Sequence, residues 1–215
     1  MDNNVSMERL FNLVFPPECI FCGRGGYSFC LSCLFSCSVI THPVCIVCKK
    51  KAIDGFTHPW CLGEGVPTHL FSCLIHVGKI VECFKRSKSG FKEFASLKDM
   101  AKYGAIYSWK TGLYYPYDFI MVSIPLTKKK KKERGFNQVD FVCDQLKKTY
   151  GLRKQNSILT RDENGFISNL ELVKGKCVLL VDDYMVSGDT LLGASKALYA
   201  AGASEVKCFT LSMVL

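Results

Sequence analysis

The chain has 215 residues, of which 48% are hydrophobic, and it carries a formal net charge of +9 at pH 7. This length provides one or two domains with a buried core. The positive charge favours anionic partners such as phosphates, nucleic acid or acidic lipid. No apolar run approaches the roughly 18 residues of a membrane helix, so the sequence predicts no membrane span.

The N-terminal segment lacks the pattern of a secretory signal. Its only apolar stretch, residues 10–15, is interrupted by Asn12 and ends at Pro16 and Pro17. It is too short for a signal core and fits a small amphipathic helix better. We therefore expect a cytoplasmic protein, in which clustered cysteines bind metal rather than form disulfides.

Eight of the 13 cysteines precede residue 62, and all of them except Cys37, which lies outside the pattern, have a paired spacing. Each C-x2-C pair fits a zinc knuckle, and two knuckles complete one tetrahedral site. The sequence predicts two successive zinc ribbons, with the ligands Cys19, Cys22, Cys30 and Cys33 in the first and Cys45, Cys48, His58 and Cys61 in the second. Because His58 stands where a cysteine is expected, one or two zinc ions remain possible. The unpaired Cys73, Cys83, Cys143, Cys177 and Cys208 lie in apolar surroundings and are expected in the core.

Beyond residues 63–67 the chain alternates between strand and helix patterns. Short apolar runs predict strands at 69–76, 118–125, 177–182 and 205–214, and helical patterns cover 78–90, 92–111, 137–150 and 190–201. This alternation predicts an α/β fold, a Rossmann-like parallel sheet covered by helices. We expect a zinc-ribbon module at residues 1–66 and the sheet domain at residues 67–215.

Two unusual segments follow predicted strands. Residues 125–136 include five consecutive lysines, Lys128 to Lys132, and residues 182–190 follow the strand at 177–182. Ligands of parallel sheets bind beyond the carboxyl ends of the strands, so we expect both segments to be loops that face one crevice. The lysine run fits a solvated loop and a phosphate site equally well.

The segment at 182–190 suits a sugar phosphate. Asp182 and Asp183 end the strand, and a helix begins a few residues later. The first N–H groups of that helix have no intrahelical acceptor and favour an anion. The predicted phosphate cradle consists of Val186, Ser187, Gly188, Asp189 and Thr190, in which Gly188 allows close backbone approach. The two carboxylates suit the vicinal hydroxyls of a ribose and a divalent cation.

Two motifs and the paired cysteines resemble a known family. VLLVDDYMVSGDTL, residues 178–191, resembles the phosphoribosyl-pyrophosphate signature of type I phosphoribosyltransferases. RGFNQ, residues 134–138, resembles the other hallmark of the ComF family, which includes ComFC-like and GntX-like proteins. The three features occur in the order typical of this family and cover nearly the whole chain.

The resemblance implies a type I phosphoribosyltransferase fold behind a zinc-ribbon module. It implies phosphoribosyl pyrophosphate bound with Mg²⁺, with Asp182 and Asp183 as catalytic acids and Lys131, Arg134 and Gly135 at the pyrophosphate. A ComFC-like role would be natural transformation, that is, competence and DNA uptake, with single-stranded DNA and a ComFA-like helicase as partners.

One segment departs from the family pattern. Residues 151–176 are shorter than the hood that covers the site in relatives, and Gln155, Arg161, Asn164 and Phe166 are its expected counterparts. A hood excludes water and completes a site. Three functions therefore remain open: a DNA-uptake factor, an active phosphoribosyltransferase of unknown acceptor, and a degenerate zinc-stabilised interaction protein.

Overall fold

The computed structural model describes residues 16–87, 94–113, 115, 116 and 118–215. The helix expected at residues 10–15 lies outside these ranges. A parallel sheet of five strands forms the centre, in the order β1-β7-β6-β2-β3. The strands are β1 (His69–Ile75), β2 (Phe119–Ser123), β3 (Arg153–Lys154), β6 (Cys177–Met185) and β7 (Glu205–Met213). The predicted α/β class is confirmed.

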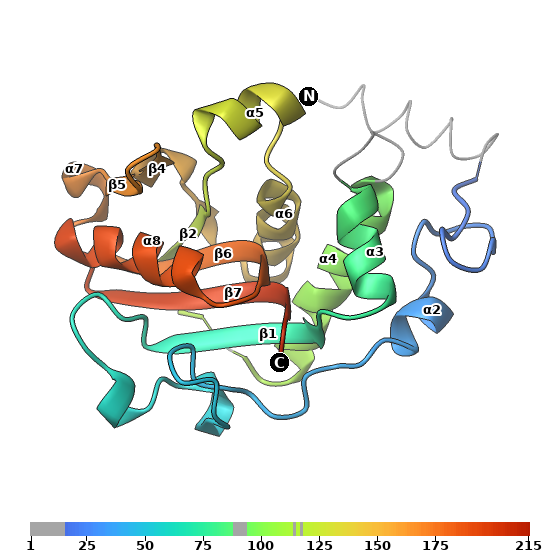
Figure 1. Ribbon diagram of the computed structural model, residues 1–215, viewed down its shortest axis with the longest axis horizontal. Coiled ribbons are helices and arrows are strands. Elements are labelled where there is room, and N and C mark those ends of the chain that lie inside the picture. The colour runs from blue at the N-terminus through green and yellow to red at the C-terminus, as the bar shows by residue number, and fades with distance from the viewer. Residues whose placement is uncertain (1–15, 88–93, 114, 117) are drawn as a thin grey trace.

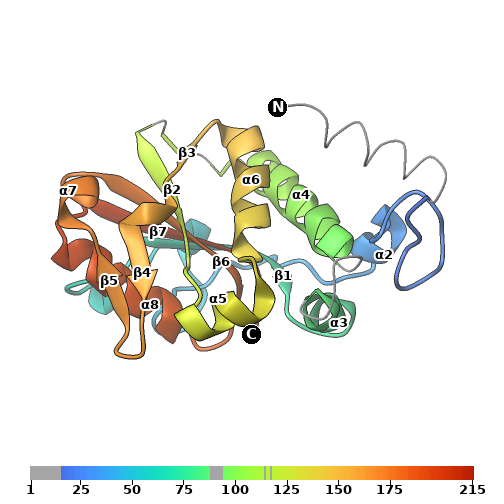
Figure 2. The same cartoon turned by 90° about the horizontal axis from the view of Figure 1, so that it is seen from above.

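Helices cover both faces of the sheet (Figures 1 and 2). One face carries α4 (Phe94–Lys110) and α6 (Val139–Tyr150), with α3 (Lys79–Arg86) beside α4. The other face carries α8 (Asp189–Ala200) and a hairpin of β4 (Leu159–Arg161) and β5 (Phe166–Ser168), followed by α7 (Leu170–Val173). Of the helices described, none has the length and apolar character that crossing a lipid bilayer requires.

The central strand β6 explains why its sequence is an unbroken apolar run. Successive side chains of a strand point to opposite faces. Leu179 and Val181 join the apolar cluster that contains α4 and α6, whereas Val178 and Leu180 join the cluster that contains α8. Because both faces are covered, neither set of side chains needs to be polar.

The two segments after β2 and β6 contain more regular structure than predicted. The lysine run is a helix, α5 (Lys128–Arg134), rather than a loop. Lysine is a good helix former, the hydroxyl of Thr127 accepts the N–H of Lys130 at 3.4 Å, and Gly135 ends the helix in the left-handed region at φ 75°. Strand β6 continues through Asp182 to Met185, so only residues 186–188 connect it to α8.

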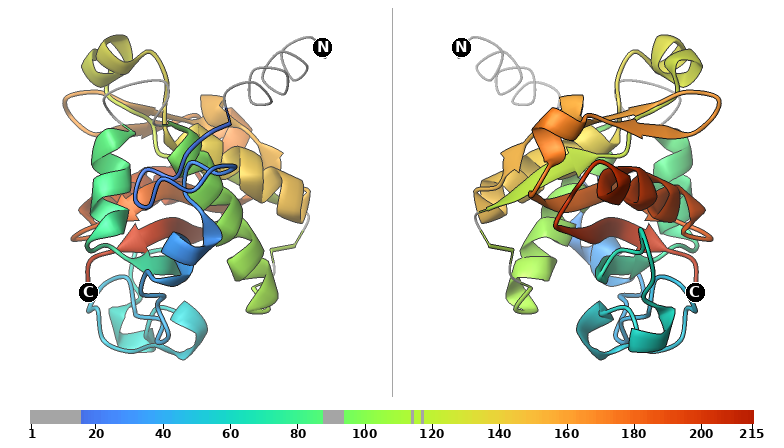
Figure 3. Two further views of the ribbon diagram at one scale, coloured as in Figure 1. Left: turned by 90° about the vertical axis from the view of Figure 1, so that its right-hand side faces the viewer. Right: turned by 90° about the vertical axis from the view of Figure 1, so that its left-hand side faces the viewer.

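The two cysteine-rich ribbons share the apolar cores of the sheet domain. The first ribbon, residues 16–37 with α2 (Leu31–Phe35), lies beside α3 and α4 and in front of them in the left view of Figure 3. Its Phe29 and Leu34 belong to the α4 cluster, and the N–H of Phe29 donates to Asp99 Oδ2 at 3.0 Å. The second ribbon, residues 44–62 with the short helices η1 (Ile53–Gly55) and η2 (Pro59–Cys61), contributes Val44 and Ile46 to the α8 cluster.

This shared packing predicts that a ribbon residue supports the helices of the sheet domain. Leu34→Ala is expected to lower the free energy of unfolding by about 2–5 kcal/mol, because it opens a cavity in the α4 cluster. Leu31→Ala in the same helix is the matched control, since Leu31 is 51% exposed and Leu34 only 1%. Denaturant unfolding followed by far-ultraviolet circular dichroism reports on the helices. An unchanged helical transition in Leu34→Ala would contradict the shared core.

Candidate functional site

A cleft of about 260 Å³ lies at the carboxyl ends of β2 and β6. Its walls come from segments that are distant in sequence: Ile124, Pro125 and Leu126 after β2, Lys130 and Arg134 of α5, Asn137, Gln138 and Val139, Arg161 of β4, residues 182–188, Thr190 and Leu191. The two segments that were expected to face one crevice therefore do so.

The acid pair lies at the base of this cleft, at the end of the central strand. Asp182 and Asp183 are each only 8% exposed. The N–H of Asp183 donates to Asp182 Oδ1 at 2.9 Å, and the N–H of Tyr184 donates to Asp183 Oδ1 at 2.8 Å. Burial, with the charge of Asp183 next to it, raises the pKa of Asp182 well above its usual value, and Arg161 opposes this only in part. The pair therefore costs free energy unless a cation or hydroxyl ligand compensates it.

The predicted phosphate cradle forms the start of α8. Gly188 is the N-cap, at φ 93°, and its carbonyl accepts the N–H of Leu192 at 2.9 Å. The hydroxyl of Ser187 donates to Asp189 Oδ2 at 2.6 Å, and the N–H of Asp189 approaches Ser187 Oγ at 3.3 Å. Val186, Ser187, Gly188 and Thr190 line the cleft, but Asp189 is not among the lining residues. The first-turn N–H groups lack intrahelical acceptors and suit an anion.

The basic wall of the cleft differs from the prediction by one residue. Lys130 and Arg134 line it, and four residues apart on α5 they occupy one helical face. Lys131, which was expected at the pyrophosphate, is not among the lining residues. A segment interpreted as a loop has no defined face, so Lys130 was missed; helical periodicity counted from Arg134 would have found it. Gly135 ends α5 and does not line the cleft.

The RGFNQ motif positions Arg134. Its Nη1 donates to Gln138 Oε1 at 2.9 Å, and Gln138 is 2% exposed. Gln138 Nε2 reaches the carbonyl oxygen of Ser87 at 3.3 Å, at the end of α3. Asn137 Nδ2 donates to the carbonyl of Ile124 at 2.9 Å, which ties the motif to the end of β2. The two amides thus hold the guanidinium at the cleft before any ligand arrives.

The shortened hood segment forms the β4–β5 hairpin. Arg161 lines the cleft, and its guanidinium carbon lies 4.7 Å from the centroid of the Phe166 ring. Phe166 in turn packs beside Gly193 of α8. Asn164 belongs to the hairpin turn, where its N–H donates to Asp162 Oδ1 at 2.8 Å. Of the four expected counterparts of the hood, only Arg161 is among the residues that line the cleft.

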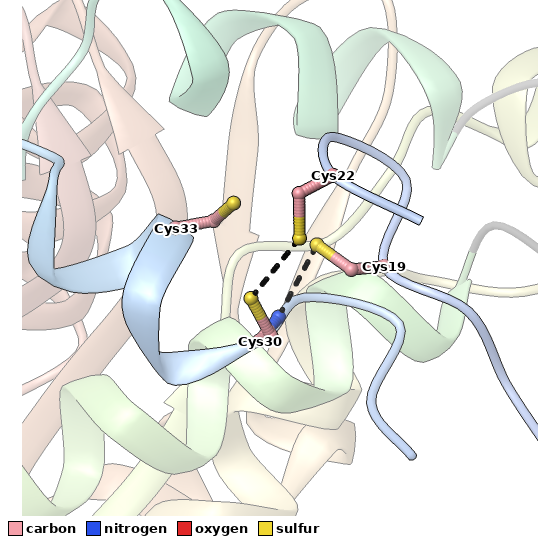
Figure 4. Close-up of side chains that lie close together, drawn as sticks. All are labelled: Cys19, Cys22, Cys30 and Cys33. Atoms are coloured by element: carbon pink, nitrogen blue, oxygen red, sulfur yellow. Dashed lines mark hydrogen bonds between the residues drawn. The ribbon is translucent and has the colours of Figure 1, made fainter. Parts of the chain in front are cut away.

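The first ribbon brings four thiols together (Figure 4). The sulfurs of Cys19, Cys22, Cys30 and Cys33 all lie within 4.8 Å of one another. Cys22 and Cys30 are 3.6 Å apart, close to the ~3.8 Å that a tetrahedral site with Zn–S bonds of about 2.3 Å requires. Burial raises the pKa of Cys19, but hydrogen bonds from backbone N–H groups, that of Cys30 foremost, bring it down to about 6. The set fits a structural zinc ion.

The second ribbon offers three thiols and one imidazole. The ligand atoms of Cys45, Cys48, His58 and Cys61 also lie within 4.8 Å of one another. His58 Nδ1 is 3.2 Å from Cys48 Sγ, while its Nε2 is 3.0 Å from the carbonyl oxygen of Lys51. A carbonyl accepts only, so Nε2 carries the hydrogen and the Nδ1 lone pair faces the thiols, as a zinc ligand requires. His58 therefore fits the fourth ligand position.

Four of the five cysteines that were expected in the core lie there. Cys73, Cys83, Cys143 and Cys208 are fully buried, and burial raises the pKa of the Cys83 thiol to about 11. Cys177 is the exception to the core assignment, since it is half-buried beside the Ser204 hydroxyl at 3.3 Å. All 13 cysteines are free thiols in this structure.

The buried acid pair predicts a pH-dependent gain of stability in Asp182→Asn. The folded-state pKa of Asp182 lies above its unfolded value, so the wild type loses stability as pH rises from about 4 through the folded-state pKa. Asparagine does not ionise, and the advantage of the variant in free energy of unfolding should grow across that window. Thermal unfolding at several pH values without ligand measures it. Asp118→Asn, at an exposed carboxylate before β2, is the control; an equal gain there would contradict the account.

Two protein-family models match the chain: a phosphoribosyl transferase domain over residues 128–212 and a double zinc ribbon domain over residues 10–65. Competence protein ComFC of Bacillus subtilis is 26% identical over 201 residues, which cover 85% of this chain and 82% of that protein. The DNA utilization protein YhgH of Escherichia coli O6:H1 is 30% identical over 122 residues, 49% of this chain and 53% of its own. The chain thus spans about half the length of YhgH.

Among solved structures, the allosteric regulatory enzyme of purine biosynthesis matches 59% of this chain and 28% of its own, at 16% identity and a TM-score of 0.41. A likeness of this size supports no functional inference. The matched domains stand in the same order as the structural units described above, a double zinc ribbon followed by a parallel-sheet domain with a cleft at its carboxyl edge. The chain therefore belongs to the ComF family of proteins with a phosphoribosyltransferase domain behind an N-terminal zinc ribbon.

Proposed function

We propose that the chain binds phosphoribosyl pyrophosphate together with Mg²⁺ in the cleft at the end of β6. The observation that carries this proposal is the arrangement of charge around the acid pair. Anion-attracting groups lie on both sides of it, with Lys130 and Arg134 on one wall and the N-terminus of α8 on the other. A ligand with two anionic ends and a diol between them would match the basic wall, the start of α8 and the acid pair between them.

Each part of the ligand has a complementary group. The 5-phosphate is assigned to the cradle from Val186 to Thr190, of which Val186, Ser187, Gly188 and Thr190 line the cleft. The pyrophosphate is assigned to Lys130 and Arg134. The ribose hydroxyls and Mg²⁺ are assigned to Asp182 and Asp183, since Mg²⁺ binds through carboxylates and substrate phosphates. Bound Mg²⁺ supplies positive charge that offsets the acid pair.

We further propose that the protein handles single-stranded DNA in the cytoplasm during DNA uptake, next to a ComFA-like helicase. The printed names of the relatives, a competence protein and a DNA utilization protein, support this role. So does the exposed lysine surface of α5. Beside it, Lys128 and Lys129 line a groove of about 450 Å³ together with the hairpin turn at Asp162, Glu163 and Asn164. Figure 2 shows α5 beside this turn.

Phosphoribosyl transfer to an unidentified acceptor is the second candidate. The observation that favours it is Arg161, which the β4–β5 hairpin presents to the cleft opposite α5. A cation there would stabilise the departing pyrophosphate, and the hairpin would shield the ribose from water. Release of pyrophosphate on addition of candidate nucleobases distinguishes transfer from binding alone.

The binding proposal predicts that Arg134→Gln loses affinity for phosphoribosyl pyrophosphate by at least about tenfold, the effect of one lost charged hydrogen bond. Isothermal titration calorimetry in the presence of Mg²⁺ measures it. Arg153→Gln removes the same charge at the exposed start of β3, where Arg153 pairs with Ile120 near the amino end of β2. Because the cleft lies at the carboxyl ends of the strands, this variant should bind like the wild type. No binding by the wild type, or equal losses in both variants, would overturn the proposed site.

The DNA proposal predicts a change in salt dependence when two lysines of α5 are removed. Lys128→Gln with Lys129→Gln should reduce the slope of log affinity against log salt for an oligothymidine strand by about 1.4, at about 0.7 for each lost contact. The matched control is Lys147→Gln with Lys148→Gln, two exposed lysines in the last turn of α6. Fluorescence anisotropy at several salt concentrations measures both slopes. Equal slopes would show that α5 is only a solvated surface.

A further inference from the structure

The second zinc ribbon directly contacts the start of α8 through one lysine. Lys49 follows the zinc-ligand candidate Cys48, and its ammonium Nζ lies 3.8 Å from Met185 Sδ at the end of β6. A Cβ placed on Gly188 would come within 2.8 Å of the same Nζ. The ammonium of the half-buried Lys49 therefore lies beside Gly188 in the phosphate cradle.

The fold of the knuckle holds this lysine in place. The N–H of Lys49 donates to the carbonyl of Cys45 at 3.0 Å, which closes the turn between the two thiols. The backbone of Lys49 is left-handed, at φ 60°, a conformation that costs a non-glycine residue free energy unless its surroundings enforce it. Its Nζ donates to the carbonyl of Ile46 at 2.6 Å. The side chain thus has a fixed direction, set by the same turn that presents the thiols.

This contact changes the explanation of Gly188. The sequence suggested that glycine is needed for the close approach of a phosphate. In the structure, the space that a side chain would fill is occupied by Lys49 Nζ, by Met185 Sδ at 3.4 Å and by the carbonyl oxygen of Ile46 at 3.5 Å. A side chain at 188 would displace the Lys49 ammonium, and the left-handed backbone of Gly188, at φ 93°, would strain any residue other than glycine. Gly188 is the point where ribbon and cradle meet.

Lys49 also lies near the acidic residue of the cradle, because Asp189 directly follows Gly188. The charge of Lys49 is attracted by the knuckle thiol of Cys45 and by Asp189. A carboxylate stabilises the N-terminus of an empty helix, but it repels a phosphate that binds at the same end. The hydroxyl of Ser187 and the ammonium of Lys49 together offset this repulsion. The zinc ribbon therefore supplies the positive charge that the loop sequence itself lacks.

We propose that Lys49 is a positioning residue through which the second zinc ribbon supports the phosphate cradle, an inference that rests on the proposed binding of phosphoribosyl pyrophosphate there. Lys49 holds the Gly188 backbone in place and neutralises Asp189. The affinity of the cleft for the phosphorylated ligand then depends on an intact second knuckle. The ribbon is part of the binding site and not only a stabilising appendage.

The test is a double-mutant cycle measured by calorimetry with phosphoribosyl pyrophosphate and Mg²⁺. Lys49→Met should lower the affinity about tenfold, because the charge of Asp189 is then no longer offset beside the bound phosphate. Asp189→Asn in the Lys49→Met background should restore most of that loss, because it removes the uncompensated charge. A purely structural role of Lys49 would make the two substitutions additive instead. Lys50→Met, the exposed neighbour, is the matched control and should bind like the wild type.

Two further measurements separate the possible failures. Zinc content by elemental analysis should be equal in all variants, which shows that the knuckle is intact. Hydrogen exchange of the ligand-free protein should be faster in Lys49→Met over residues 183–192 and unchanged over α6. If the wild type binds no phosphoribosyl pyrophosphate, the proposed function fails. If the wild type binds and Lys49→Met binds equally well with unaltered exchange, only the inference about Lys49 is overturned.

Discussion

The burial of two adjacent carboxylates at the end of the central strand is the constraint on which the rest of the site depends. Asp182 and Asp183 cannot move away from each other, because they are consecutive residues of β6, which β7 fixes through the pairs of Asp182 with Thr210 and Tyr184 with Ser212. The backbone N–H groups of Asp183 and Tyr184 offset part of their repulsion, and other segments bring further compensating groups to the cleft. The cations of α5, the arginine of the hairpin and the N-terminus of α8 all converge there. An anionic ligand with bound Mg²⁺ would compensate both kinds of charge, because its phosphates attract the cations and its Mg²⁺ attracts the two carboxylates.

The zinc ribbons contribute to this arrangement through packing as well as charge. Each ribbon adds apolar side chains to a different face of the sheet, so the two ribbons hold the domain from both sides. The second ribbon also reaches the cradle, where Lys49 meets Gly188. A small cysteine-rich module that cannot build a core of its own gains stability from metal and from a neighbouring domain. In our proposal, the second ribbon in turn adds the positive charge of Lys49 to the phosphate cradle.

Features set by local spacing could be predicted from the sequence. The knuckles of C-x2-C pairs, the apolar run of β6 and the helix after Gly188 depend on residues close together in the chain. Features set by long-range contacts could not. Helix α5 was missed for another reason: five identical lysines show no apolar periodicity, although its caps, Thr127 and Gly135, are local signals. The contact of Lys49 with Gly188 joins the N-terminal ribbon to the start of α8, so no local pattern in the sequence predicts it.

The most direct measurement is a crystal structure of the protein with phosphoribosyl pyrophosphate and Mg²⁺. The account predicts the 5-phosphate at the first turn of α8, between Ser187 and Thr190, the pyrophosphate beside Lys130 and Arg134, and the ribose hydroxyls at Asp182 and Asp183. It also predicts that Lys49 keeps its contact with the Gly188 backbone. Density for the ligand elsewhere, or an empty cleft at saturating ligand, would contradict it.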